Sequence, residues 1–228
     1  TRLIPCSTQL RVDAKAYKLE AVNRQIPSAV DRMKPAMRKV LTGAIRLAGA
    51  AGGNKARKVF QVAGSVAEPA FYHHGEASLN GTIINMAQYF PGARNYPYLI
   101  GVGQFGSRHD GRNTKLPSAR YISVRLAKPF VDAVYPPEDK YLRAHVFEDG
   151  ERAEPCVYTP TIPMSVLENG EYPSEGWKHT SFARDLGAVL AVVRKLLAAD
   201  AEGAALAALA DRIRAAGMTA GVREALAP

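Results

Sequence analysis

The feature that most constrains the fold is a short run, Tyr121 to Leu126, in which apolar and polar side chains alternate. The apolar residues are Ile122, Val124 and Leu126, and the residues between them are Tyr121, Ser123 and Arg125. Because successive side chains of a strand point to opposite faces, this pattern predicts a strand with one face in the core. The other face presents Tyr121 beside Arg125, with Arg120 directly before the tyrosine. A phenol held next to guanidinium groups is placed where it could attack a phosphate.

Composition places the chain among globular proteins. Of its 228 residues, 47% are hydrophobic and 22% are charged, which argues against wholesale disorder. No apolar run approaches the roughly 18 residues of a membrane span, and no signal peptide is recognisable. The first residue is Thr1 and not Met, so we expect the chain to be a piece of something longer. Cys6 and Cys156 have no Cys or His partners at zinc-ligand spacing, so we predict two buried free thiols in a reducing compartment.

The net charge of +9 is concentrated in one part of the chain. The window from Arg32 to Lys128 holds fifteen basic and three acidic residues, so it carries +12 and the remainder carries −3. A positive field confined to one half is typical of a face that binds a polyanion. A solvated basic surface without a ligand gives the same pattern, so charge alone does not choose between the two.

The segments of this window follow a recognisable order. Apolar spacing predicts three helices, then two strands joined by the polar loop Gly106 to Ala119. The helices are expected over Met37–Leu47, Lys58–Glu68 and Ser78–Phe90, and the strands over Tyr98–Phe105 and Tyr121–Leu126. Ser78 is the expected cap of the third helix, whose outward face would carry Asn80, Asn85 and Gln88. This is the order of a winged-helix DNA-binding module, a variant of helix-turn-helix.

The composition changes after Pro136-Pro137. Strands are expected within 141–147 and 157–167, and two amphipathic helices within the Ala- and Leu-rich tail Phe182 to Leu226, broken near Ala201 to Gly203. We therefore predict an α+β chain in three parts: an N-terminal arm (1–24), a winged-helix domain with its β-wing (25–142) and a second domain (143–228).

Several short motifs occur in a fixed order along the chain. They are Ile26-Pro27-Ser28, Lys34-Pro35, Arg38-Lys39-Val40-Leu41, Ala63-Gly64-Ser65-Val66-Ala67-Glu68, Tyr72-His73-His74-Gly75-Glu76, Thr82-Ile83-Ile84-Asn85, Gly103-Gln104-Phe105-Gly106 and Arg120-Tyr121-Ile122. Together they resemble the breakage–reunion region of type IIA DNA topoisomerases of the eukaryotic or viral kind. Pro136-Pro137, Pro160 to Met164 and Gly176-Trp177 resemble the approach to the tower domain of that family. The resemblance implies that the second domain is the first part of an α/β tower.

The resemblance also implies a role for each matching residue. Tyr121 would be the nucleophile, which attacks a backbone phosphate and stays linked to the 5′ end of the cut strand. Arg120 would stabilise charge on that phosphate, with Arg24 and His74 as the other active-site residues. Lys34, Arg38 and Lys39 match positions that contact the DNA backbone. Arg125, on the polar face of the predicted strand, is expected to contact the backbone as well.

Chemistry accounts for these residue types independently. A tyrosine hydroxyl titrates near pH 10 and is a weak nucleophile at neutral pH, so it needs a base or a positive field. Phosphoryl transfer places negative charge on non-bridging oxygens, where arginine forks and a histidine donor help most. Metal ions usually assist at the attacking or leaving oxygen. The basic window has no dense carboxylate cluster, so we expect no metal ligand in this chain.

The cofactors and partners of the family are then expected mostly outside this chain. The resemblance implies Mg²⁺ and ATP in the full enzyme, with the metal held by a TOPRIM-type domain in cis or as a separate subunit. It implies double-stranded DNA as substrate, a homodimer as the working form, and no membrane. The site of action would be intracellular, in the nucleus or wherever the genome is handled. Alone, the chain is expected to bind DNA but to cleave it poorly.

The chain departs from the family pattern at three places, one of which is Ala119, where the family often has proline before the Arg-Tyr pair. The family usually has glycine where this chain has Arg32, which would put one more positive charge near the DNA. The family tower usually carries a Gly-Ile-Gly-Thr-Gly run whose isoleucine wedges between base pairs, and this chain has Tyr172-Pro173-Ser174-Glu175-Gly176 instead. Proline can act as an intercalating wedge, so we expect Pro173 or Tyr172 to help bend the duplex.

Two other interpretations stay open on the sequence alone. A winged-helix module that binds DNA without cleaving it fits the charge and the order of elements. A tyrosine recombinase also combines Arg, His and Tyr. That interpretation lacks a second Arg two or three residues after a His, and it leaves the other motifs unexplained.

Overall fold

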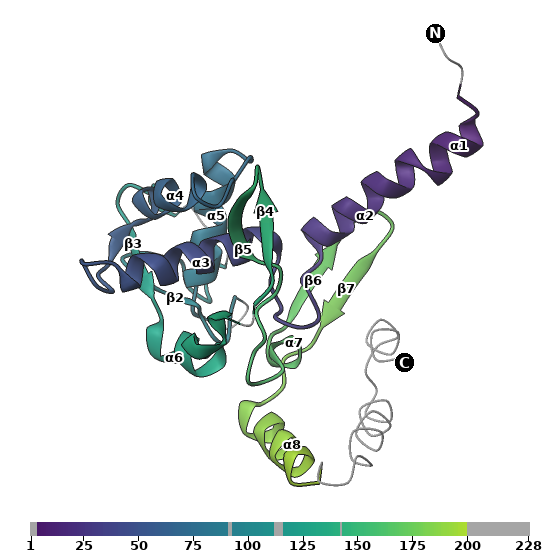
Figure 1. Cartoon of the computed structure of the whole chain (residues 1–228). Coiled ribbons are helices and arrows are strands. Elements are labelled where there is room, and N and C mark those ends of the chain that lie inside the picture. The colour runs from purple at the N-terminus through teal and green to yellow at the C-terminus, as the bar shows by residue number, and fades with distance from the viewer. Residues whose placement is uncertain (1–3, 91–92, 112–115, 142, 200–228) are drawn as a thin grey trace.

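Two helices lead into the basic window and project from the rest of the molecule (Figure 1). The computed structural model describes residues 4–90, 93–111, 116–141 and 143–199. The leading helices are α1 (Cys6–Arg11) and α2 (Asp13–Gln25), and most of their side chains are exposed. The predicted N-terminal arm is therefore helical.

The basic window folds in the predicted order. Its elements are α3 (Pro35–Gly49), β1 (Arg57–Lys58), α4 (Val59–Ala67), α5 (Glu76–Ala87), β2 (Leu99–Val102) and β3 (Ser123–Leu126). Three helices followed by two antiparallel strands confirm the winged-helix prediction. The short strand β1, which the sequence did not predict, adds a third strand to the sheet.

The central strand of this sheet is β3, which pairs with β1 on one side and β2 on the other. Val124 lies opposite Arg57 of β1 and Gly101 of β2, while Ser123 lies opposite Lys58. The predicted alternation is confirmed, because Ile122, Val124 and Leu126 are each at most 3% exposed. One face of the sheet thus packs against the core, and the other face points away from it.

The helices pack under this sheet at short range. A Cβ atom added to Gly43 of α3 would overlap the side chain of Val66 of α4, so glycine lets these two helices approach closely. Val40, Leu41, Val62 and Leu79 of the three helices are all at most 4% exposed and belong to the same core as β2 and β3. This single core fixes the position of β3 relative to α3 and α4.

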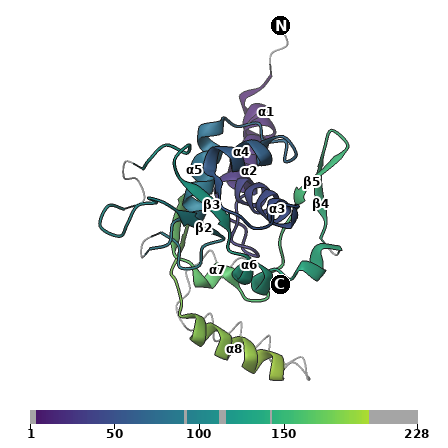
Figure 2. The same ribbon diagram turned by 90° about the vertical axis from the view of Figure 1, so that its left-hand side faces the viewer.

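The second part of the chain is made of short elements. They are α6 (Lys128–Val134), the 3₁₀ helix η1 (Pro137–Tyr141), the hairpin β4 (His145–Glu148) and β5 (Glu151–Pro155), α7 (Met164–Leu167), the hairpin β6 (Gly170–Pro173) and β7 (Lys178–Ser181), and α8 (Leu186–Ala199). Figure 1 and Figure 2 both show α8 on the side of the molecule away from α1. The predicted break near Ala201 to Gly203 and the second tail helix lie outside the described residues.

The strand predicted within 157–167 is wrong. Prolines 160 and 163 lack the N–H groups that a sheet ladder needs, and the chain forms α7 instead of a strand at Met164–Leu167. Two details of α5 also differ from the prediction. The helix begins after Gly75, and the hydroxyl of Ser78 pairs with Tyr72 instead of capping the helix. Gln88 is fully buried and donates to the Phe105 carbonyl, so it does not lie on an outward face.

The two cysteines are free thiols, but both are exposed. The prediction that they are buried is therefore wrong. Cys6 lies in the first turn of α1, and Cys156 follows directly after β5.

Arg32 occupies a position that suits glycine. Its backbone has φ of 60°, in the left-handed region that costs an ordinary residue roughly 1–2 kcal/mol. Its side chain is nevertheless held in place: the guanidinium donates to the Ser181 hydroxyl and lies 4.9 Å from the centre of the Tyr172 ring. Arg32 is only 2% exposed, so the expectation that it adds a charge near DNA is wrong. Its contacts join the segment before α3 to the β6–β7 hairpin.

This geometry predicts an order of stability for two substitutions. Arg32→Gly and Arg32→Ala both remove the contacts to Tyr172 and Ser181, so both should unfold at lower urea concentration than the wild type. Only alanine keeps the left-handed strain, so Arg32→Gly should be more stable than Arg32→Ala by about 1 kcal/mol. The free energy of unfolding measured by urea titration checks this order. Equal stability of the two variants would show that residue 32 is unstrained.

Candidate functional site

Tyr121 lies in a turn immediately before β3, with its side chain 74% exposed. The strand was predicted to begin at this residue but begins two residues later, at Ser123. The backbone N–H of Tyr121 donates to the Ser118 carbonyl over 2.8 Å, which closes the turn. The next residue, Ile122, is 2% exposed and anchors the turn in the core. The phenol is therefore free in solvent while its backbone is held.

Three successive residues at the start of α4 hold this turn from the other side. The N–H of Val59 donates to the Ile122 carbonyl over 3.0 Å, and the N–H of Phe60 donates to the Ala119 carbonyl over 3.3 Å. The ammonium of Lys58 donates to the carbonyl of Tyr121 itself over 2.9 Å. We call residues 118–122 the tyrosine turn. These three hydrogen bonds hold the tyrosine turn against the N-terminal end of α4.

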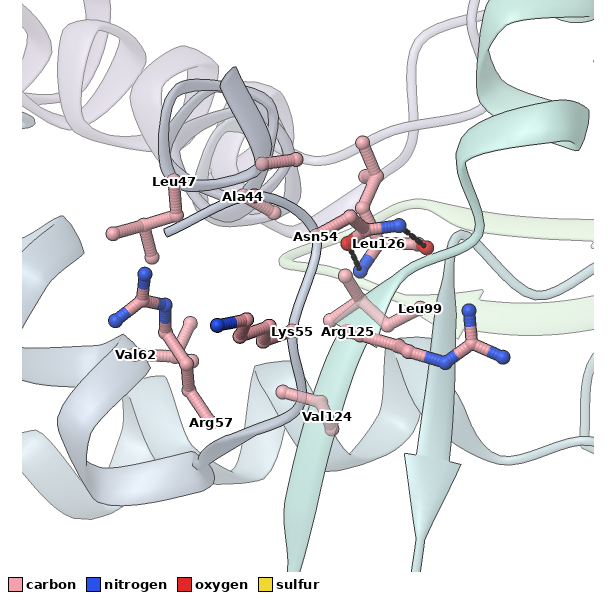
Figure 3. Close-up of a pocket in the computed structure, with 12 residues that line it drawn as sticks. Ala44, Leu47, Asn54, Lys55, Arg57, Val62, Leu99, Val124, Arg125 and Leu126 are labelled. Carbon is pink, nitrogen blue, oxygen red and sulfur yellow. Dashed lines mark hydrogen bonds between the residues drawn. The ribbon is translucent and has the colours of Figure 1, made fainter. Parts of the chain in front are cut away.

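Cations are distributed over both faces of the sheet. Lys58 lies opposite Ser123 in the register of β1 and β3, so it shares the outer face with Arg125. Figure 3 shows the side chain of Arg125 extending away from those of Lys55 and Arg57, on the far side of β3. Arg120 and Arg125 are both exposed. The outer face thus offers exposed positive charge next to the phenol of Tyr121.

A small pocket lies behind the sheet, between α3 and the end of β3 (Figure 3). Asn54 closes it by hydrogen bonds to both backbone groups of Leu126, with distances of 2.9 Å and 3.0 Å. The side chains of Ala44, Leu47 and Val124 line its apolar interior. These contacts fix the C-terminal end of β3, which is the strand that follows Tyr121.

His74 lies in the turn between α4 and α5 and is exposed. Its ring makes an edge contact with Tyr72, with ring centres 5.5 Å apart. The neighbouring His73 is hydrogen-bonded to Glu148 of β4 over 2.6 Å, and this contact lowers the pKa of the Glu148 carboxyl, with a smaller effect from Lys39. The β4–β5 hairpin therefore helps to hold the turn that carries His74.

The four predicted active-site residues do not all come together within one chain. Arg120 adjoins Tyr121, but the tyrosine turn is bound to the first residues of α4 and His74 follows its last ones. Nine residues of α-helix rise about 13 Å, so the length of α4 separates the tyrosine turn from the start of the connection that carries His74. Arg24, exposed in the last turn of α2, precedes α3, whereas the C-terminal half of α3 is the part beside β3. Figure 1 shows the end of α2 and β3 at opposite ends of α3.

Three of the predicted DNA-contacting cations are engaged with protein groups. Arg38 makes two hydrogen bonds to the buried Asp31 carboxylate, at 2.7 Å and 3.1 Å. Lys39 donates to Glu154 over 2.9 Å and also to the Ala70 carbonyl. Lys34 is half-buried, with its ammonium 5.1 Å from the centre of the Tyr172 ring, and burial lowers its pKa.

The predicted wedge residues lie on the β6–β7 hairpin. Tyr172 is packed inward, where Arg32 and Lys34 contact its ring and His179 stacks on it. Pro173 is exposed at the last pair of the hairpin, opposite Lys178. Trp177, which the sequence analysis did not select as a wedge, is 63% exposed in the turn of the same hairpin. A large aromatic residue in a Gly-containing turn was the available signal.

No group of three or more His, Cys, Asp or Glu side chains in the described part of the chain could hold a metal ion. Within those same residues no helix is long and apolar enough to cross a membrane.

Comparison with known proteins gives concordant matches. Residues 24–208 match the family of DNA gyrase/topoisomerase IV, A-type subunit. The chain is 53% identical over 194 residues to DNA topoisomerase 2 of African swine fever virus (isolate Tick/South Africa/Pretoriuskop Pr4/1996). The aligned region covers 85% of this chain and 16% of the viral protein. It is 41% identical over 175 residues to DNA topoisomerase 2-alpha of Cricetulus griseus, covering 76% of this chain and 11% of that protein.

A solved structure agrees with these sequence matches. The DNA-binding, cleavage and re-ligation domain of Plasmodium falciparum topoisomerase II superposes with a TM-score of 0.74 at 33% identity, covering 80% of this chain and 24% of that one. The chain spans about a sixth of the length of the viral relatives that it matches.

Proposed function

The chain belongs to the type IIA DNA topoisomerases, and on this basis we propose that Tyr121 cuts DNA by forming a transient phosphotyrosyl bond. One observation carries the proposal: Tyr121 is 74% exposed while both of its backbone groups are hydrogen-bonded. A nucleophile presented on a rigid frame is favoured for attack on a large substrate, because little freedom is lost when the reacting atoms meet. The exposed Arg120 and Arg125 support a phosphate as the target.

The proposed reaction is a reversible transesterification. The phenol oxygen of Tyr121 bonds to the phosphorus and gives up its proton. The bond from phosphorus to the 3′ oxygen breaks, and that oxygen takes up a proton. The 5′ phosphate remains on the tyrosine until the 3′ hydroxyl attacks in the reverse step. Arg120 stabilises the charge on the non-bridging oxygens, and in the full enzyme the cycle accompanies ATP-dependent passage of one duplex through another.

The remaining active-site groups are proposed to come from a second copy of the chain. His74 and Arg24 lie away from the phenol of their own chain, separated from it by α4 and α3. An arrangement of two copies, with one tyrosine for each strand of the duplex, would bring these groups to the partner's tyrosine. The homodimer and the shared site thus form one proposal.

The DNA backbone contacts are proposed to include Lys34, Arg38, Lys39 and Arg125. Arg125 is free to make such a contact, since it is exposed on the outer face. Arg38 and Lys39 must first exchange the carboxylates of Asp31 and Glu154 for phosphates. We therefore propose that Arg125 contributes more to DNA affinity than Arg38 or Lys39.

The metal and the nucleotide are proposed to bind outside this chain. The described residues do not fit Mg²⁺, because they offer no cluster of carboxylate or imidazole ligands. A TOPRIM-type domain, in cis or as a separate subunit, is proposed to hold the metal. The residues of this chain supply the nucleophile, the positive field and the DNA surface, in the cell compartment that holds the genome.

The first prediction concerns the nucleophile. With Mg²⁺ and the metal-binding part of the enzyme supplied in cis or in trans, denaturation should leave protein covalently attached to DNA 5′ ends. Tyr121→Phe should abolish the adduct while DNA affinity changes less than about twofold, because only the hydroxyl is lost. Gel electrophoresis of end-labelled DNA checks both results. Absence of any wild-type adduct would instead support a DNA-binding module without cleavage, and attachment to 3′ ends would support a recombinase.

The second prediction concerns the shared site. Chains carrying Tyr121→Phe and chains carrying His74→Ala are given different tags, and the mixed dimer is purified. If His74 serves the partner's tyrosine, one site of this dimer is intact, so it should nick one strand at about the wild-type rate for a single site. A site within one chain would leave the mixed dimer no faster than the His74→Ala homodimer, expected to be on the order of 10²-fold slower. That slow rate would refute the shared site.

The third prediction concerns DNA bending by the β6–β7 hairpin. Pro173→Ala should reduce the bend angle of bound DNA, measured by energy transfer between dyes on the duplex ends, because the exposed ring no longer separates a base step. Trp177→Ala tests the neighbouring exposed aromatic in the same assay. Tyr172→Phe is the matched control, since its ring keeps the contacts to Arg32 and Lys34. An unchanged bend angle in both Pro173→Ala and Trp177→Ala would exclude this hairpin as the wedge.

A further inference from the structure

We propose that Lys58 is a positioning residue for Tyr121, acting through the hydrogen bond from its ammonium to the carbonyl of the nucleophile. The inference rests on the proposed function, in which Tyr121 attacks DNA. The resemblance to known topoisomerases did not single out Lys58, and it was not among the residues predicted from sequence. The observation behind it is the 2.9 Å contact between Lys58 Nζ and the Tyr121 oxygen.

Lys58 is itself held firmly at its backbone. It is the last residue of β1, where it lies opposite Ser123 of β3, and it is also the N-cap residue of α4. Its backbone N–H donates to the Gln61 side chain over 3.3 Å, as in a capping box. A side chain that starts from a strand end and a helix start has little freedom in the position of its Cα atom. The Lys58 side chain can therefore hold the Tyr121 carbonyl in a defined position.

The carbonyl of Tyr121 needs such a partner because the sheet does not supply one. The pairing of β1 with β3 ends at Lys58 and Ser123, and Tyr121 lies beyond it in the turn. The Lys58 side chain takes the place of the missing ladder hydrogen bond. Without this hydrogen bond, only the hydrogen bonds of neighbouring residues restrain the peptide group between Tyr121 and Ile122. A rotation of that peptide group would move the phenol.

The charge of Lys58 favours the same role. An ammonium has three donors, and one of them is used on the carbonyl. Lys58 shares the outer face with Ser123 and Arg125, so its charge also contributes to the field at the phenol. A guanidinium in its place could keep both the bond and the charge, whereas a methionine of similar length would lose both.

The test compares three variants in single-turnover cleavage of DNA at saturating concentration. Lys58→Met should slow formation of the 5′ adduct by about 10²-fold, the effect of roughly 1 Å of misplacement. Lys58→Arg should recover most of that rate. Lys140→Met is the matched control, because Lys140 is exposed in η1 outside the basic window, and it should cleave like the wild type.

The dissociation constant for DNA and its salt dependence separate positioning from phosphate binding. For a positioning residue, Lys58→Met leaves the slope of log K against log salt unchanged. If the slope instead falls by about one while the rate at saturating DNA is preserved, Lys58 is a phosphate contact and the proposal is wrong. An unchanged rate with an unchanged slope also overturns it.

A measurement without DNA distinguishes this proposal from the proposed function. Hydrogen exchange of the Tyr121 amide, which donates to Ser118, reports whether the tyrosine turn opens. Lys58→Met should speed this exchange at least tenfold, with α3 and α5 amides unchanged as a check on the global fold. Unchanged exchange would refute the positioning role even if the wild type formed no adduct.

Discussion

The structure depends on one buried carboxylate. Asp31 is fully buried and accepts hydrogen bonds from the Arg38 guanidinium, from the backbone N–H of Met33 and from that of Tyr158. Its backbone carbonyl also accepts from the Tyr135 hydroxyl. The carboxylate thus joins the segment before α3 to α3 itself and to a residue more than a hundred positions later. Removing one partner of such a buried pair typically costs about 3–5 kcal/mol, because the other charge is left without compensation.

The order of helices and strands in the basic window could be predicted because its signals are local. Alternation at 122, 124 and 126 identifies β3 from six residues, and apolar spacing identifies α3 and α5 from one helix face each. The prediction was wrong where the contact of a single residue differed from what the helical spacing indicates. Gly75 is the N-cap residue of α5 in place of Ser78, and the buried Gln88 donates a side-chain hydrogen bond to the Phe105 carbonyl. Neither partner is visible from spacing within the helix.

The sequence indicates which residues are candidates for the site but not how they are arranged in space. Charge counting marks the window from Arg32 to Lys128 as strongly basic, but two of its cations meet acids from the other part of the chain. Lys39 binds Glu154, and Arg94 binds Glu168. Acids outside the window therefore neutralise cations within it, whereas Arg120 and Arg125 stay exposed. Contacts over such sequence separations have no local signature.

The attachment of the tyrosine turn to α4 has a mechanical consequence. If DNA is joined to Tyr121 as proposed, any tension in the strand enters the protein at that side chain. The turn passes this load to Lys58 at the end of β1 and to the first two residues of α4, and α4 passes it to α3 along the close contact at Gly43 and Val66. A cut DNA end can therefore be carried by movement of the whole winged-helix unit, with the covalent bond spared from bending.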